Sequence, residues 1–541
     1  MAGNALYYGD NLEILHDHID TESVDLVYLD PPFNSQRNYN VLFKETTGES
    51  SPAQIQAFTD TWAWDRAAEA AFDNLIDTGP HNVATMISAM REFVGRNDMM
   101  AYLVMMAQRL VELHRVLKPT GSLYLHCDPT ASHYLKMLLD TVFGKTRFMS
   151  EISWRRTSAH SDAAQGRKNM GHIRDVLLFY TKSAKYIWNI QYTPYSAEYV
   201  AKNYKHIDPE NGKFFTHSDL TAAKGGGDTS YEWKGRKPYS GRFWAYSKAN
   251  MDKFEVEGRL FYTTTGTPRL RNYLDDMPGI PLQDDWSDIE PASGTERLGY
   301  PTQKPLELLE RIIKTSSNPG DVVLDPFCGC GTAVVAAQSL GRSWVGIDIT
   351  HLSIALMKNR LIDAFGSGVK FEVEGEPEDV GSARMLADTD RYQFQWWASS
   401  LVNAQPVDGK EKKGADRGID GVIRFVDDAP GKIKRVLVQV KSGHVNSATM
   451  RDLIGTLERE KAEMGMLVTL EPSTKPMRQE ALEAGKYYSP GWNREFPRIQ
   501  ILTIEELLTG TKPDVPPMRA TFERAQRIKS KSTHSQPSLL E

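Results

Sequence analysis

Short apolar runs that end at an acidic residue recur along the sequence. Residues 24–29 form such a run, which is rich in β-forming side chains and is followed by Asp30. Comparable runs lead to Asp10, Asp325 and Asp348. A short apolar run bounded by polar residues is typical of a buried strand in a parallel sheet. The pattern therefore predicts several buried strands, each with a carboxylate at its end.

Between these strands, apolar residues recur at the spacing of an α-helix. The clearest case is residues 100–117, which are followed by Pro119 and Gly121. Further helices are predicted over residues 133–143, 307–314 and 333–340. Residues 34–100 are predicted to be mixed and mainly helical. The alternation of strands and helices predicts an α/β fold with a doubly wound sheet.

The first strand continues into the motif Asp30-Pro31-Pro32-Phe33. Because neither proline can donate to a strand ladder, the strand must stop there, at the edge where α/β sheets bind ligands. The Asp30 carboxylate and the Pro31 carbonyl can accept the two N–H bonds of an exocyclic amino group while the Phe33 ring stacks on the base. A tight strand-to-loop turn would explain the same residues without a ligand.

A glycine-rich turn follows the strand that ends at Asp325. It contains Phe327, Gly329 and Gly331 and leads into a helix, so the backbone can approach a ligand closely at the helix N-terminus. The next strand ends at Asp348, 21 residues after Phe327, close to the spacing of about 20 expected for a carboxylate that binds ribose hydroxyls. This order of elements predicts a site for an adenosine-containing cofactor.

Residues 186–295 break the α/β pattern. They are rich in glycine, aromatic and basic residues, for example in residues 231–237. Basic side chains contact phosphate and guanine, and aromatic ones stack on bases, so this composition predicts a nucleic-acid reader. Residues 151–274 hold 20 Lys+Arg against 12 Asp+Glu, whereas residues 1–150 hold 11 against 19. Core packing of a small α+β insert, or a solvated region with excess lysine, would give the same composition.

The overall composition sets wider limits. A chain of 541 residues exceeds what one hydrophobic core usually supports, so about two to four domains are expected. The net charge of -6 argues against indiscriminate binding of polyanions. The sequence shows neither a secretion signal nor an apolar run of about 18 residues, and its three cysteines cannot form a four-cysteine zinc site. We expect a cytoplasmic protein without a membrane span.

Together, the Phe-x-Gly-x-Gly turn and the Asp-Pro-Pro-Phe motif resemble the DNA amino-methyltransferases that use S-adenosylmethionine. The Asp-Pro-Pro-Phe motif comes first and the basic insert lies between the two. This order resembles the circularly permuted β group, which includes the modification subunits of type III restriction systems. Residues 109–122 and 300–305 match further motifs. The resemblance covers residues 1 to about 370 and implies a methyltransferase sheet, double-stranded DNA as partner, a bacterial, archaeal or phage source, and family members that often dimerise.

The resemblance also implies roles for single residues. It places Asp10 beside the cofactor adenine and residues 302–305 near its methionine end, and it favours N6 of a flipped adenine over N4 of cytosine, because cytosine enzymes more often begin the motif with serine. Cys330 replaces a serine that is commoner in the family. The predicted cofactor-binding residues are Asp10, Asp30, Thr302, Gln303, Lys304, Asp325, Phe327, Gly329, Gly331 and Asp348, and the predicted catalytic residues of this domain are Asp30, Pro31, Pro32 and Phe33.

The chain changes character after the methyltransferase motifs. Residues 372–390 are predicted to form an acidic, helix-poor linker. Beyond it, Asp420 at the start of one strand, and Gln439 and Lys441 on the next, would gather at one sheet edge. Asp420 and Gln439 would bind Mg²⁺ through oxygen, and Lys441 would orient the attacking water or stabilise the phosphorane charge.

This arrangement resembles the Mrr-type restriction endonucleases, a branch of the PD-(D/E)xK nucleases with Gln in the acidic position. The favoured function is a single-chain restriction–modification enzyme that methylates adenine and cuts DNA. The alternative is an adenine or cytosine methyltransferase whose last domain binds DNA without cutting it. The predicted domains are the catalytic part of the methyltransferase (1–185), the target-recognition region (186–295), the cofactor-binding part (296–371), the linker (372–390), the nuclease domain (391–515) and a basic, disordered tail (516–541).

Overall fold

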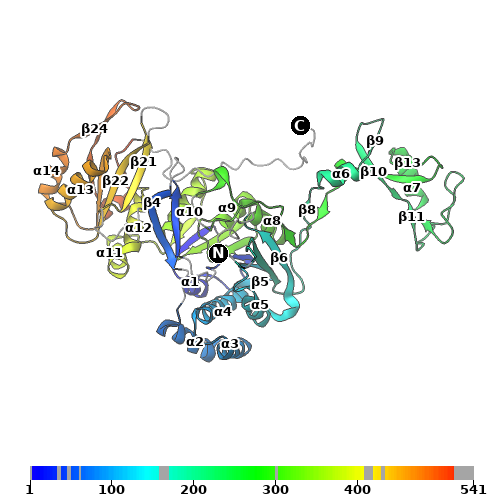
Figure 1. Cartoon of the computed structure of the whole chain (residues 1–541), viewed down its shortest axis with the longest axis horizontal. Coiled ribbons are helices and arrows are strands. Elements are labelled where there is room, and N and C mark those ends of the chain that lie inside the picture. The colour runs from blue at the N-terminus through cyan, green and yellow to red at the C-terminus, as the bar shows by residue number, and fades with distance from the viewer. Residues whose placement is uncertain are drawn as a thin grey trace. The chain divides into compact units, whose positions relative to one another are not determined.

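The computed structural model of the chain describes residues 3–32, 38–44, 50–59, 63–157, 168, 170–298, 302–406, 418–427 and 433–516. The chain divides into a larger unit, which runs to Asn189 and resumes at Asp284, and a smaller unit of Ile190–Gln283 (Figure 1). Within the described ranges, no helix has both the length and the apolar content needed to span a membrane.

A nine-stranded sheet organises the first part of the larger unit, as far as the described residues show (Figure 1). Its order is β16 (Asp285–Trp286), β6 (Phe148–Arg155), β7 (Arg174–Thr181), β5 (Leu117–Cys127), β2 (Val24–Leu29), β17 (Val322–Asp325), β18 (Ser343–Asp348), β1 (Ala5–Tyr8) and β19 (Glu372–Glu374). From β5 to β19 all neighbours are parallel, whereas β7 is antiparallel to both of its neighbours. The predicted doubly wound α/β sheet is confirmed, with a reversed strand that the sequence pattern did not reveal.

Helices cover both faces of this sheet. They are α1 (Asn11–His18), α2 (Arg66–Thr78), α3 (His81–Val94), α4 (Asp98–Val116), α5 (Ser132–Leu139), α8 (Leu306–Ser316), α9 (Thr332–Ser339) and α10 (His351–Phe365). On one face, Leu110 of α4 and Val27 of β2 are fully buried in the same apolar cluster. On the other face, the Tyr124 hydroxyl of β5 lies 2.8 Å from the Ser316 hydroxyl of α8. Each fully buried leucine or valine side chain stabilises the fold by about 1.5–3 kcal/mol.

Residues 34–100 contain less helix than the sequence predicts. Helices α2 and α3 lie in this segment, but β3 (Asn38–Lys44) and β4 (Ser50–Thr59) precede them as an antiparallel pair. The prediction of a mainly helical segment is therefore wrong for its first part. Strand pairing depends on partners across the ladder, which the spacing of residues within one strand does not show.

The segment 372–390 is not helix-poor, so that prediction is also wrong. Its first residues form β19, which pairs in parallel with β1 at the edge of the large sheet. Helix α11 (Val380–Thr389) follows and begins with a capping box, in which Asp379 accepts from the Ser382 amide at 2.7 Å. The alternating acids therefore belong to an edge strand and a helix cap rather than to an extended linker.

The smaller unit has its own core. Its main sheet has the order β13 (Leu260–Tyr262), β14 (Pro268–Tyr273), β10 (Phe214–Asp219) and β9 (His206–Ile207). Leu260 and Leu270 lie on one face of this sheet and pack into a buried cluster with Trp233 and Trp244. Trp233 and Trp244 are therefore core residues of this unit. This agrees with the alternative interpretation of the aromatic composition, in which a small insert packs its own core.

The C-terminal part of the larger unit is built on a second sheet. Its order is β20 (Gln405–Pro406), β21 (Gly421–Val426), β22 (Ile433–Lys441), β23 (Met464–Thr469) and β26 (Ile499–Thr503), with helices α12 (Arg391–Leu401), α13 (Ser447–Glu460), α14 (Lys475–Glu483) and α15 (Ile504–Leu508). Val438 and Trp397 of α12 lie in one buried cluster, and Leu437 and Leu457 of α13 lie in another. Because neighbouring residues of β22 face opposite sides, helices cover both faces of this sheet as well.

Candidate active site

Four acidic residues lie where adjacent parallel strands end. Asp30 directly follows β2, Asp325 and Asp348 end β17 and β18, and Asp10 lies two residues after β1. These strands are neighbours in the order β2-β17-β18-β1. The fold therefore joins two motifs that are far apart in the sequence, at the sheet edge where ligands bind.

A cavity of about 670 Å³ lies at this edge. Its volume is within the roughly 300–1,000 Å³ typical of cofactor sites. The predicted site residues that line it are Asp10, Asp30, Pro32, Thr302, Gln303, Lys304, Asp325, Phe327, Gly329 and Asp348. Pro31 is buried next to them, and Gly331 lies between the lining residues Cys330 and Thr332. Phe33 lies outside the described residues.

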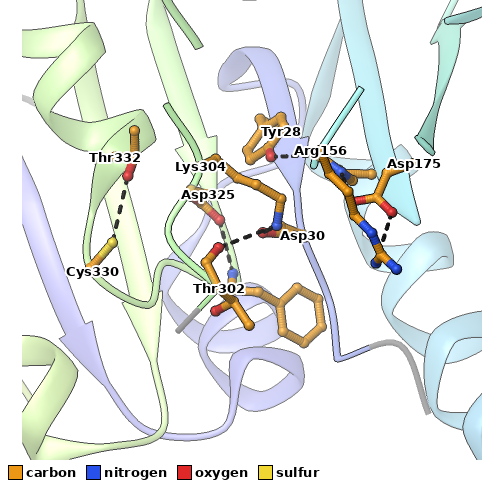
Figure 2. Close-up of polar contacts among 11 residues, drawn as sticks. Tyr28, Asp30, Arg156, Asp175, Thr302, Lys304, Asp325, Cys330 and Thr332 are labelled. Carbon is orange, nitrogen blue, oxygen red and sulfur yellow. Dashed lines mark hydrogen bonds and ion pairs between the residues drawn. The ribbon is translucent and has the colours of Figure 1, made fainter. Parts of the chain in front are cut away.

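The Asp30 carboxylate forms an ion pair with Lys304 (Figure 2). The two side chains are 15% and 9% exposed, so solvent screens their attraction only weakly. Lys304 Nζ also donates to the Thr302 carbonyl at 3.4 Å. A carboxylate can accept several hydrogen bonds at once, so Asp30 can hold Lys304 and still accept an N–H bond from a ligand.

The glycine turn after β17 depends on backbone conformations that favour glycine. Gly329 and Gly331 have φ of +53° and +74°, in the left-handed region. The Gly329 amide donates to Asp348 Oδ2 at 2.8 Å, which ties the turn to the end of β18. A Cβ atom on Gly331 would lie 2.6 Å from Cγ of Met357. The turn therefore has no room for a side chain at this position.

Arg360 of α10 holds the same turn through hydrogen bonds. It is 5% exposed, and its Nη1 donates to the Cys330 carbonyl at 2.8 Å and to Thr332 Oγ1 at 3.1 Å. The Cys330 side chain is buried and lies 3.5 Å from the Thr332 hydroxyl (Figure 2). Arg360 was not among the predicted site residues. No local motif marks a helix residue that bonds to a loop 30 positions earlier in the sequence.

Arg109 organises the Asp10 side of the cavity. Its Nη2 donates to both carboxylate oxygens of Asp10 at 2.8 and 2.9 Å, and its Nε donates to Asn11 Oδ1 at 2.5 Å. Asn11 in turn donates to the Pro326 carbonyl at 2.7 Å. These contacts connect the loops after β1 and β17. In the sequence, Arg109 stands out only as part of a motif, which gives it no role of its own.

Replacing Arg109 by methionine is expected to destabilise the protein by about 1–3 kcal/mol. Truncating one partner of a buried pair costs about 3–5 kcal/mol, and the 39% exposure of the Asp10 side chain reduces this. Thermal unfolding measures the loss. The control is Arg96→Met, because Arg96 is 63% exposed in its contact with Glu69 and should change stability by about 0.5 kcal/mol or less. Equal effects would contradict the role of Arg109.

The cavity is acidic. Its charged lining residues are Asp10, Asp30, Asp65, Asp325, Asp348, Arg109 and Lys304. Burial raises the pKa of Asp325 well above its usual range, and the negative charges of Asp30 and Asp348 reinforce this shift. Burial also raises the pKa of Asp348. A cationic ligand would relieve the repulsion among these carboxylates, so the site favours a ligand that carries positive charge.

Of the predicted nuclease site, Asp420 directly precedes β21, and Gln439 and Lys441 lie on its antiparallel neighbour β22. The Asp420 amide donates to the Val438 carbonyl at 2.9 Å, and Asp420 Oδ2 accepts from the Val440 amide at 2.7 Å. Gln439 is 5% exposed, and Lys441 lies on the same face of β22, two residues further on. The described residues contain no cluster of three His, Cys, Asp or Glu side chains that could hold a metal ion. The predicted Mg²⁺ ligands, the Asp420 carboxylate and the Gln439 amide oxygen, are not a cluster of this kind, so the Mg²⁺ site stays a prediction.

Comparisons with known proteins agree with this geometry. A family model described as DNA methylase, of the N6 and N4 type, matches residues 24–359. A second model, described as NACHT-associated inactive Restriction Endonuclease 1, matches residues 403–509. The C-terminal domain is thus similar to a nuclease-like family described as inactive, and the predicted Mrr relationship and DNA cleavage gain no support from it.

The chain is also similar to characterised methyltransferases. It is 36% identical to the type II methyltransferase M.EcaI of Enterobacter cloacae over 46% of this chain and 54% of the relative. It is 27% identical to the StyLTI Mod subunit of Salmonella typhimurium over 63% and 50%, and 24% identical to the DNA adenine methyltransferase YhdJ of Escherichia coli over 66% and 82%. The matches span about half the length of the first two relatives. Because the DNA methylase model covers more than half of the sequence, from the strand before Asp30 to α10, the chain belongs to the N6/N4 DNA methylase family.

Proposed function

We propose that the chain transfers a methyl group from S-adenosylmethionine to N6 of adenine in double-stranded DNA. The observation that carries this proposal is the shared cavity. Asp30, the proposed acceptor of the target amino group, lines the same space as Gly329 of the glycine turn and Asp348, the proposed ribose-binding carboxylate. The positive charge of a sulfonium ligand fits the acidic lining described above.

The residues divide into two groups by their place in the cavity. Asp10, Asp348 and the glycine turn around Gly329 would hold the adenosine part, with Arg109 fixing Asp10. Asp30 and the Pro31 carbonyl would accept the N–H bonds of the target amine. S-adenosylmethionine supplies an electrophilic methyl group on sulfur. The amine nitrogen is a poor nucleophile, because its lone pair is delocalised into the ring, so orientation next to the methyl group supplies most of the rate.

Adenine is the proposed target for two reasons. The motif begins with Asp30, where cytosine enzymes more often have serine, and one relative is named a DNA adenine methyltransferase. A base inside the duplex cannot reach such a cavity, so the target base would leave the duplex, and Phe33 would stack on the flipped base. N4 of cytosine remains the second candidate, since its amino group makes the same two hydrogen bonds.

The smaller unit is the proposed target reader. On the face opposite Leu260 and Leu270, its four-stranded sheet carries Phe261, which pairs with Arg269. The His217 ring stacks on the Phe261 ring with centroids 5.1 Å apart. Aromatic and basic groups on one face can stack on bases and contact phosphate. Dimerisation of the chain, which the family resemblance implies, stays a prediction.

Methyl transfer from labelled S-adenosylmethionine to unmodified genomic DNA tests the proposal. Label is expected in N6-methyladenine at one short sequence, identified by nucleoside analysis and by sequencing of the modified DNA. Label in N4-methylcytosine would move the target to the second candidate. Absence of label with a folded protein would refute the function.

We further propose that the C-terminal domain binds DNA without cutting it. The similarity to a family described as inactive supports this alternative over cleavage. Lys441 would contact phosphate as a point charge. DNA binding by this domain should weaken with salt, because phosphate contacts release counterions.

Supercoiled plasmid incubated with the protein and Mg²⁺ is therefore expected to remain intact, with or without S-adenosylmethionine. Agarose gel electrophoresis over hours measures this. A Lys441→Ala variant should weaken retention of the plasmid in a gel-shift assay, whereas Lys486→Ala, in an exposed ion pair with Glu495, should not. Linear or nicked product that disappears in Asp420→Ala would restore the nuclease prediction.

A further inference from the structure

A line of buried polar side chains leads away from the cavity across three strands. The hydroxyl of Tyr28, a cavity-lining residue, lies 3.1 Å from Nδ1 of His126, and Nε2 of His126 lies 3.2 Å from Oδ2 of Asp175. The far oxygen of Asp175 is in an ion pair with Arg156 at 3.1 Å (Figure 2). Tyr28, His126 and Asp175 are between 0% and 3% exposed. The line therefore links the site to the partly exposed Arg156.

The sheet order explains why these residues meet. Tyr28 is on β2, His126 on β5 and Asp175 on β7, which are neighbours in the sheet. Tyr28 and Asp30 point to the same face, because they are two residues apart. His126 is held edge-on to the Trp154 ring, with centroids 5.6 Å apart. A histidine buried in this way, between a hydroxyl and a carboxylate, has a defined orientation.

The protonation states follow from the hydrogen bonds. Burial would raise the pKa of Asp175, but the bond and charge of His126 and the charges of Lys304 and Arg156 lower it. Burial raises the pKa of Tyr28 well above its usual range, with Asp30 adding to the shift. An ionised Asp175 must accept the Nε2–H of His126. In a neutral imidazole Nδ1 is then an acceptor and takes the Tyr28 O–H. The Tyr28 oxygen keeps lone pairs for another donor.

We propose that Tyr28 is a catalytic residue that receives the proton released by the methylated amine, and that two positioning residues support it: His126, which takes up the Tyr28 proton, and Asp175, which stabilises the resulting His126 cation. This proposal rests on the proposed methyl transfer. The amine nitrogen forms the bond to the methyl carbon while the carbon–sulfur bond breaks and its electron pair stays on sulfur. The nitrogen then carries a positive charge and gives its proton to the Tyr28 oxygen, and the Tyr28 proton passes to Nδ1 of His126. Asp175 stabilises the imidazolium.

Charged groups of both signs surround Tyr28, His126 and Asp175. Asp30 and Asp325 lie near Tyr28, and Lys304 and Arg156 act on Asp175. Asp128 and the buried Cys127 follow His126 on β5 and also interact with Asp175.

Single-turnover methyl transfer to a short duplex, measured in H₂O and in D₂O, tests the relay. The wild-type rate is expected to be lower in D₂O, because the relay moves protons between oxygen and nitrogen atoms. His126→Gln should react about 10²-fold more slowly and lose this solvent isotope effect. Tyr28→Phe, which lacks one oxygen atom, should be about 10²-fold slower with cofactor affinity within threefold of the wild type. The control is His114→Gln, because His114 lies outside the cavity and packs edge-on against Phe143; it should keep the wild-type rate and isotope effect.

A wild-type rate and isotope effect in a His126→Gln protein that binds S-adenosylmethionine normally would overturn the proposal. So would a Tyr28→Phe rate within threefold of the wild type. If His126→Gln does not fold, the Tyr28→Phe rate decides. A wild-type protein that neither binds S-adenosylmethionine nor methylates DNA would refute the proposed function itself, whereas normal methylation without a solvent isotope effect would refute the relay alone.

Discussion

Replacing Asp30 by alanine is expected to slow methyl transfer by at least about 10³-fold while S-adenosylmethionine still binds. The carboxylate accepts the target amine only when the base is in place, so its loss affects the reaction far more than the cofactor. Removal of a single preorganised hydrogen-bonding group from an active site commonly costs about 10²–10³-fold, and here the group also positions the nucleophile. Single-turnover transfer of labelled methyl and calorimetric binding of S-adenosylmethionine measure the two effects separately.

The ion pair with Lys304 makes a second variant necessary. Asp30→Ala leaves the buried Lys304 ammonium without its carboxylate, which destabilises the fold. Asp30→Asn keeps an oxygen for Lys304 and the shape of the side chain, so it should fold normally and still be slow. Asp288→Asn is the control, because Asp288 forms a comparable pair with Arg311 in an exposed position. Normal transfer by Asp30→Asn would contradict the assigned role.

Replacing Gly331 by alanine is expected to weaken binding of S-adenosylmethionine by at least about 10²-fold. The residue has φ of +74°, and a Cβ atom would lie 2.6 Å from Met357, closer than atoms can approach. The turn must shift, and the backbone at the start of α9 moves with it. A shift of about 1 Å at a binding site costs on the order of 10² in function. Calorimetry with S-adenosylmethionine measures the affinity.

Gly341 offers a matched control for this change. Its φ of +71° is nearly the same, but a Cβ atom added there would have no neighbouring atom within 4 Å. Gly341→Ala therefore introduces the same backbone strain, about 1 kcal/mol, without the clash and away from the cavity. Equal losses of cofactor affinity in the two variants would show that strain alone is responsible, and that the turn beneath the cofactor tolerates a side chain.

Much of the candidate site could be predicted because its motifs are local. Asp30 follows a strand that two prolines terminate, and Gly329 and Gly331 occupy a turn that other residues rarely adopt. The residues that support these motifs were not predictable in the same way. Arg109 and Arg360 lie inside ordinary amphipathic helices, where an arginine usually faces solvent. Only the packing of α4 and α10 against the loops shows that both are buried and bonded to the site.

The C-terminal domain depends on a different kind of evidence. The pattern of Asp420, Gln439 and Lys441 resembles a nuclease, and the structure places Asp420 beside the strand that carries the other two, with its carboxylate bonded to the Val440 amide. Binding without cleavage is favoured by the similarity to a family described as inactive, which the pattern of these three residues does not reveal.

The sequence by itself determined the local elements: strands that end in acids, the glycine turn, the helices between them, and the class of cofactor they suit. These follow from backbone chemistry within a few residues. The tertiary structure alone decided that β2 lies next to β17, so that Asp30 and the glycine turn share one cavity, and that β7 runs in reverse beside β5, so that Asp175 meets His126. Such neighbours come from strand pairing between distant segments, which no local pattern encodes.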